Sequence, residues 1–156
     1  MKFLPLLAGL LLASPAAAQG TDPHTVLTLR GECQALAAGS EDLIDICAGE
    51  IMQVIYTDHR MELAIWTDSP SGRFLVFSGP ATEDEAGLAQ QIDLVIDGQD
   101  GSGNNNVDRA ATGQCTLNGN PSEGPVQFTC EATDDAGNGY RFAFLTDGGV
   151  PENMLD

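Results

Sequence analysis

Positive charge is scarce in this sequence. Lys2 is the only lysine, and five arginines accompany it against 23 aspartates and glutamates. A surface with this charge repels nucleic acid and anionic membranes, and it favours cations and basic partners. Acidic charge can also serve only to keep a protein soluble. We therefore expect no nucleic-acid partner, and the charge alone leaves the protein partner or small ligand unknown.

The short motifs of common enzymes are also missing. There is no Gly-x-Ser-x-Gly, no His-Glu-x-x-His and no phosphate-binding glycine loop. Of the two histidines, His59 lies in a predicted turn beside Asp58, where a solvated side chain is commoner than a catalytic base. Acid pairs such as Asp58 with Asp68 could catalyse hydrolysis only if the fold placed them in one cleft. We therefore expect no catalytic residues.

Long apolar runs are absent except at the N-terminus. Residues 1–18 combine Lys2, an apolar run from Phe3 to Ala13, and small residues at Ala16 and Ala18. This pattern predicts a secretory signal peptide cut after Ala18, of bacterial type, with a eukaryotic secretory origin as the alternative. No later segment approaches the roughly 20 apolar residues of a membrane-spanning helix. We expect a periplasmic or secreted protein without membrane insertion, with residues 19–156 as its single domain.

Four cysteines in an exported chain predict two disulfides. Three pairings can be drawn, and the sequence separations favour the two local ones, Cys33–Cys47 and Cys115–Cys130. The chain has no Cys-x-x-Cys pair and no Cys/His cluster, so the cysteines predict neither a zinc site nor a thioredoxin-like activity.

Residues 22–49 are predicted to form a helical hairpin. Asp22 and Pro23 resemble a helix start, and Gly39 can end that helix. Ser40 can cap a second short helix. The break between the helices at Gly39 would let Cys33 and Cys47 come within disulfide distance. A strand is the competing interpretation for 24–30, where threonine and β-branched residues are frequent. The helical interpretation depends on apolar residues at three- and four-residue intervals, namely Val26, Leu29, Cys33 and Leu36.

Residues 50–147 alternate between apolar and polar positions with the period of strands. Thr82 and Glu85 favour one helical turn over 83–90 within this region, and 148–156 is expected to be a loose tail. The predicted fold is α+β, with the helical hairpin packed on a six- to seven-stranded antiparallel β-meander that can curl toward a barrel. The expected strands are 51–57, 61–67, 73–78, 92–96, 109–118, 126–132 and 140–146.

Two of these strands are expected to be joined by a disulfide. If Cys115 lies opposite Cys130, then Leu117 lies opposite Phe128 on the same face, and the bridge holds the register of the pair. Tyr140, Phe142 and Phe144 alternate along the last strand, and we interpret them as core residues rather than as a surface for stacking ligands.

The loop at 97–108 is dense in oxygen ligands and in residues that tolerate positive φ. Calcium is the one cofactor this composition suggests. The spacing fits neither an EF-hand nor a stacked calcium repeat, and a flexible hairpin connection explains the composition as well. The candidate metal ligands are Asp97, Asp100, Asn104, Asn105 and Asp108.

We expect a non-enzymatic, disulfide-stabilised module that binds a protein or small ligand. Trp66 and His59 are the candidate binding residues, because Trp66 lies on the strand face opposite Leu63 and Ile65 and His59 lies in an exposed turn. Calcium binding through 97–108 is the first alternative function, and secreted acid-catalysed hydrolysis is the second.

Overall fold

The computed structural model describes residues 22–100 and 104–156, so the predicted signal peptide lies outside the described residues. The described part is all-β apart from one 3₁₀ turn, η1 (Ile44–Ile46). Its strands are β1 (Pro23–Ala38), β2 (Glu41–Asp42), β3 (Cys47–Tyr56), β4 (Arg60–Thr67), β5 (Phe74–Asp84), β6 (Gly87–Gly98), β7 (Val107–Leu117), β8 (Gln127–Asp134), β9 (Gly139–Thr146) and β10 (Glu152–Asn153).

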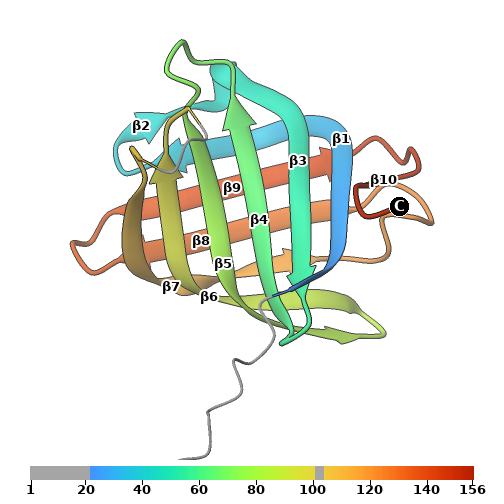
Figure 1. The fold of residues 1–156 in the computed structure, drawn as a ribbon. Helices are drawn as coiled ribbons and strands as arrows, with labels where there is room; N and C mark the ends of the chain where they lie inside the picture. The colour runs from blue at the N-terminus through green and yellow to red at the C-terminus, as the bar shows by residue number, and fades with distance from the viewer. Residues whose placement is uncertain (1–21, 101–103) are drawn as a thin grey trace, which may run out of the picture.

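Eight long strands close into an antiparallel barrel (Figure 1). Strands β3 to β9 run as a meander, and β1 pairs with β3 on one side and with β9 on the other. All seven strands expected between 50 and 147 are confirmed. The predicted α+β fold is wrong, because the segment assigned to a helical hairpin supplies the strand that closes the barrel.

A β-bulge explains the helix-like spacing of Cys33 and Leu36 in β1. Register shifts between Cys33 and Ala35, so that Cys33 lies opposite Phe144 and Leu36 lies opposite Phe142. Both phenylalanines are fully buried, and Cys33 and Leu36 therefore face inward although they are three positions apart in the sequence. A strand with one bulge reproduces the apolar spacing of a helix over this short stretch. The strand interpretation of 24–30 is confirmed.

Two other helical predictions are also wrong. The segment from Ser40 to Gly49 forms β2, η1 and the start of β3, and buried Leu43 caps the end of the barrel near β2, which we call the upper end. Residues 83–90 form the turn of the β5–β6 hairpin, with Glu83 opposite Leu88. This hairpin curls beneath the opposite, lower end of the barrel (Figure 1).

The barrel interior is filled by side chains. The aromatic stripe on β9 is confirmed as core, and the ring centroids of Phe142 and Phe144 lie 5.9 Å apart. Burying each such side chain stabilises the fold by about 1.5–3 kcal/mol. The largest fully buried side chains are Phe77, Phe128, Phe142, Phe144, Leu36, Ile51, Met61, Leu63, Ile65, Leu75, Gln90 and Val95.

Both expected disulfides are present. Cys115–Cys130 joins β7 to β8, and Leu117 lies opposite Phe128 as predicted. Cys33–Cys47 joins β1 to the first residue of β3. It therefore closes the segment of β2, Leu43 and η1 that lies between these two strands at the upper end. Two disulfides indicate an oxidising, extracytoplasmic location. None of the helical structure formed by the described residues is long and apolar enough to cross a membrane.

The C-terminal segment, expected as a loose tail, packs against β1. Strand β10 pairs with Leu27 and Thr28, and the Met154 N–H donates to the Val26 carbonyl at 2.9 Å. The first half of β1 has β3 on one edge only, because β9 pairs with residues 31–38. The segment after β9 therefore covers an edge that would otherwise be open.

Candidate functional site

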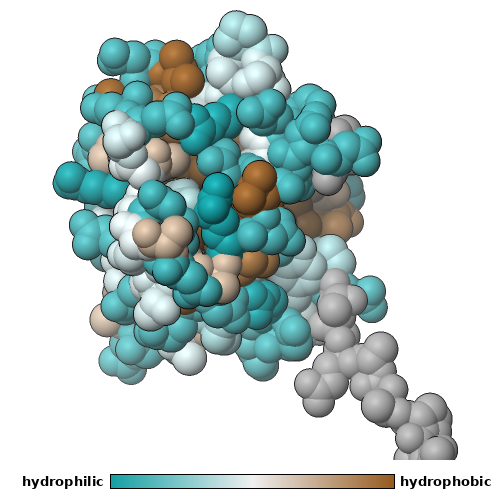
Figure 2. All heavy atoms as spheres, turned by 90° about the vertical axis from the view of Figure 1, so that its left-hand side faces the viewer, coloured by the Kyte–Doolittle hydropathy of each residue, from teal (hydrophilic) through white to brown (hydrophobic). Residues whose placement is uncertain are grey.

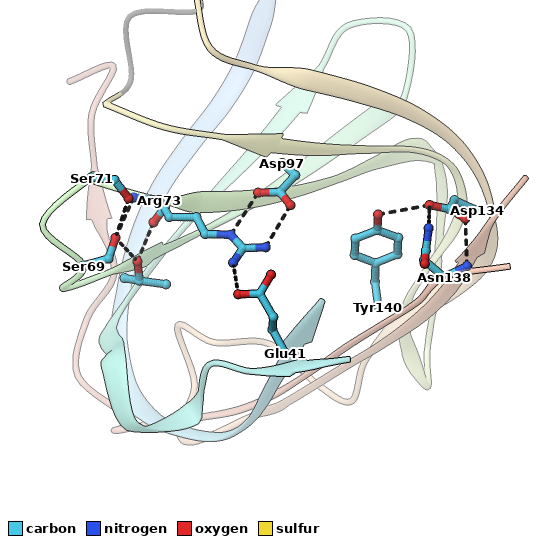
Figure 3. Close-up of polar contacts among 9 residues, drawn as sticks. Glu41, Ser69, Ser71, Arg73, Asp97, Asp134, Asn138 and Tyr140 are labelled. Carbon is cyan, nitrogen blue, oxygen red and sulfur yellow. Dashed lines mark hydrogen bonds and ion pairs between the residues drawn. The ribbon is translucent and has the colours of Figure 1, made fainter. Parts of the chain in front are cut away.

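The upper end of the barrel is closed by an arginine that bridges three segments (Figure 3). Arg73 donates to both carboxylate oxygens of Asp97, from Nε at 3.1 Å and Nη2 at 2.9 Å. Its Nη1 donates to Glu41 of β2 at 2.8 Å. With only 16% of the Arg73 side chain exposed, these bonds hold the cap on the barrel and leave its guanidinium little room for a ligand.

A second polar group at this end organises the β8–β9 turn (Figure 3). Asp134 accepts hydrogen bonds from the backbone N–H groups of Ala136 and Asn138, from Asn138 Nδ2 at 3.0 Å, and from the Tyr140 hydroxyl at 3.1 Å. The Asn138 side chain is the largest cause of a lowered pKa at Asp134. Both carboxylate oxygens are fully used within the turn, so this group stabilises a hairpin and offers no acceptor to a substrate.

Asp97 and Asp108 of the proposed calcium loop lie on opposite faces of the sheet. Asp97 lies opposite buried Leu75 and faces inward, toward Arg73. Asp108 pairs with Ile96, the residue before Asp97, and therefore faces outward.

The middle of that loop is partly outside the described residues, which omit 101–103. Asn105 donates from Nδ2 to Asp100 Oδ2 at 3.2 Å, and Asn104 lies next to it in an exposed turn. Within 22–100 and 104–156, no three His, Cys, Asp or Glu side chains gather closely enough to hold a metal. Calcium binding at 97–108 stays a prediction.

The two candidate binding residues lie apart on the outer surface. His59 has φ of 66° at the exposed β3–β4 turn, where its N–H donates to the Tyr56 carbonyl at 3.0 Å. Trp66 is half-buried on the outside of β4, opposite Phe74 of β5. The structure brings neither residue to a pocket.

A pocket of about 140 Å³ opens at the lower end of the barrel, between the β5–β6 hairpin and the loop at 119–122. Its walls include four aliphatic side chains from four strands, namely Leu27, Ile55, Leu88 and Leu117. Gln53 forms part of the wall from β3, and Glu83 lines it from the hairpin. The combination is an apolar slot with one amide inside and one carboxylate at its edge.

Gln53 is the unusual residue of this lower-end pocket. Its neighbours across the sheet, Leu27 and Leu63, are inward-facing, and Gln53 itself is only 3% exposed. Its Nε2 donates to the Met61 thioether at 3.3 Å, a weak acceptor, and its Oε1 accepts no hydrogen bond from the described residues. Among the described residues, the buried side-chain acceptor without any partner is Gln90 Oε1, not Gln53 Oε1. Because Gln53 lines the pocket, a ligand there can replace water as the donor to its oxygen.

The sequence contained a signal for Gln53 that composition alone does not reveal. Ile51, Gln53 and Ile55 occupy alternate positions of one strand, which places the amide on the core face. A glutamine in that position predicts a buried polar function. The complete pocket could not be anticipated, because the β1–β3 pair and the β6–β7 pair, which supply its walls, meet only when the barrel closes.

The outer surface is mainly hydrophilic. Figure 2 shows the side that lies at the left of Figure 1, where hydrophilic side chains surround small, separate hydrophobic patches. Near the lower-end pocket, Glu83, Asp84 and Glu85 follow one another at the β5–β6 turn, all exposed and none in an ion pair within the described residues. Glu83 therefore brings one carboxylate to the rim of the pocket, and Asp84 and Glu85 follow it in the exposed turn.

One pair on the outer face gives a direct spectroscopic prediction. The Tyr56 hydroxyl donates to Glu62 Oε2 at 2.8 Å, and burial followed by this bond raises the pKa of Tyr56 to about 12. Burial and Asp134 also raise the pKa of Tyr140, the only other tyrosine. We expect less tyrosinate absorbance from the folded protein at pH 10, about the pKa of a free tyrosine, than from the unfolded chain, because both pKa values are raised.

Glu62→Gln is expected to lower the pKa of Tyr56, because it removes the negative charge beside the phenol, and to leave that of Tyr140 unchanged. Because the Tyr56 pKa is raised on folding, its contribution to stability is fully present below pH 10 and declines as the pH rises toward 12. Half-ionisation of both tyrosines at pH 10 in folded protein would contradict the assigned contact.

No protein-family model matches the chain, and comparisons with curated proteins and with solved structures found no match.

Proposed function

We propose that this protein is an exported, non-enzymatic module that binds a cationic protein in the periplasm or outside the cell. The observation that carries the proposal is the large excess of carboxylates over basic side chains. From residue 19 onward, five arginines against 23 acids leave a net charge of −18. Three of those arginines, Arg30, Arg60 and Arg73, are already paired with carboxylates of the same chain.

A protein partner is favoured over a small ligand carried in the barrel. Small-molecule sites usually occupy 300–1,000 Å³ and enclose most of the ligand. Here the barrel interior is occupied by phenylalanine and aliphatic side chains with no exposure, as on β5 and β9. Recognition is therefore assigned to the outer surface and to the ends of the barrel, where charge complementarity speeds association with a basic protein.

Binding of octalysine tests this function. We expect the mature protein to bind labelled octalysine with an affinity that falls steeply as salt is added, and not to bind octaglutamate. The triple variant Glu83→Gln, Asp84→Asn, Glu85→Gln should weaken binding roughly tenfold if each lost pair is worth about 0.5 kcal/mol. Fluorescence anisotropy at low and high salt measures both effects.

A matched triple variant provides the control. Asp42→Asn, Asp45→Asn and Asp135→Asn remove the same charge from the upper end of the barrel and should change octalysine binding much less. Failure to bind octalysine at low salt would contradict the proposed function, and so would equal binding of octaglutamate. An equal loss in the two triple variants would show that net charge acts without a preferred surface.

A further inference from the structure

The lower-end pocket has the size of one aromatic ring. We infer that it binds a single tyrosine side chain of the cationic partner, with lysine or arginine residues on either side of that tyrosine. This inference rests on the proposed function. An apolar cavity of about 150 Å³ holds one benzene molecule. The pocket volume of about 140 Å³ and its aliphatic walls match a phenyl ring rather than an indole.

The buried amide selects the group at the tip of that ring. Gln53 lines the pocket, and the printed hydrogen bond of its side chain uses Nε2, which leaves Oε1 open to a donor inside the pocket. A phenol inserted between Leu27 and Leu117 carries a hydroxyl donor that can satisfy this oxygen, whereas phenylalanine brings none. A lysine ammonium would lose its hydration beside a neutral amide, with no carboxylate on the inner wall, and is disfavoured.

The rim of the pocket selects what lies beside the tyrosine. Glu83 lines the opening, and Asp84 and Glu85 extend the negative charge along the hairpin turn. Basic residues that flank the inserted tyrosine would meet these carboxylates while remaining in contact with water. An aromatic anchor surrounded by charged rim contacts is the usual arrangement of an interface hot spot.

Three peptides separate the contributions of ring, hydroxyl and charge. Calorimetry on the mature protein would compare Gly-Lys-Tyr-Lys-Gly with the same peptide carrying phenylalanine in place of tyrosine, and with Gly-Glu-Tyr-Glu-Gly. The lysine–tyrosine peptide is expected to bind about tenfold more tightly than the phenylalanine peptide, since one hydrogen bond is lost. The glutamate peptide should not bind.

Variants locate the effect in the pocket. Gln53→Leu should abolish the preference for tyrosine over phenylalanine and keep the salt dependence of binding. Leu88→Trp, which fills the pocket from its wall, should weaken the tyrosine peptide to the level of a peptide with alanine in place of tyrosine. Leu145→Trp adds the same side chain at an exposed position on β9 and serves as the matched control, which should bind like the wild-type protein.

The outcomes distinguish this inference from the proposed function. Equal, salt-dependent binding of the tyrosine and phenylalanine peptides would overturn the tyrosine pocket and leave binding of a cationic protein standing. No binding of octalysine or of either lysine peptide would overturn both. Binding of p-cresol alone as tightly as the tyrosine peptide would overturn the docking of a partner and assign the pocket to free phenols.

Discussion

Replacing both Cys115 and Cys130 with alanine is expected to lower the free energy of unfolding by about 3 kcal/mol, the value for a closed loop of this length in the chain-entropy model. The disulfide joins residues 15 apart in sequence. Both cysteines are at most 1% exposed and belong to the core cluster, so the alanines also leave small cavities. Denaturant unfolding of the oxidised protein and the double variant measures the difference.

The other disulfide is a natural control. Cys33 and Cys47 are 14 residues apart, so the stabilisation expected from closing this loop is nearly the same as for Cys115–Cys130. Both cysteines, however, are only partly buried. We expect Cys33→Ala with Cys47→Ala to destabilise the protein less than the Cys115 and Cys130 double variant. If the Cys115 and Cys130 double variant were as stable as the wild-type protein, this would contradict a disulfide within the core between β7 and β8.

Gly31→Ala is expected to lower the free energy of unfolding by about 2–3 kcal/mol, in the range for overpacking a close contact. Gly31 is the first residue of β1 to pair with β9, immediately after Arg30 pairs with β3. A methyl group there would lie 2.1 Å from the Leu145 carbonyl oxygen and 2.8 Å from the Thr146 Cα. Since both obstacles are backbone atoms, β1 and β9 must move apart.

Gly139→Ala is the matched control for the barrel closure. A methyl group at Gly139 meets nothing within 4 Å, and its backbone is outside the positive-φ region, so little loss of stability is expected. Hydrogen exchange should show faster exchange of the β1 and β9 amides in Gly31→Ala than in Gly139→Ala. Equal stability of the two variants would contradict the pairing that closes the barrel.

The proposed site was less accessible from the sequence than the fold was. The candidates taken from the sequence, at 97–108, His59 and Trp66, are surface features recognisable from composition or local pattern. The lower-end pocket instead combines Leu27 and Ile55 of the β1–β3 pair with Leu88 and Leu117 of the β6–β7 pair, which is distant in the chain. Only the inward position of Gln53 on its strand was visible in advance.

The sequence by itself determined the acidic composition and favoured the disulfide pairings that the structure shows. It also revealed the aromatic core stripe and seven of the eight barrel strands, because side-chain alternation is a local property of each strand. Tertiary structure alone decided that 23–38 is a strand. The bulge after Cys33 gives this segment a helix-like spacing, and its pairing partners lie at opposite ends of the chain, from β3 to β9. A segment whose local pattern fits two structures adopts the one whose backbone hydrogen bonds and apolar face are completed by the rest of the fold.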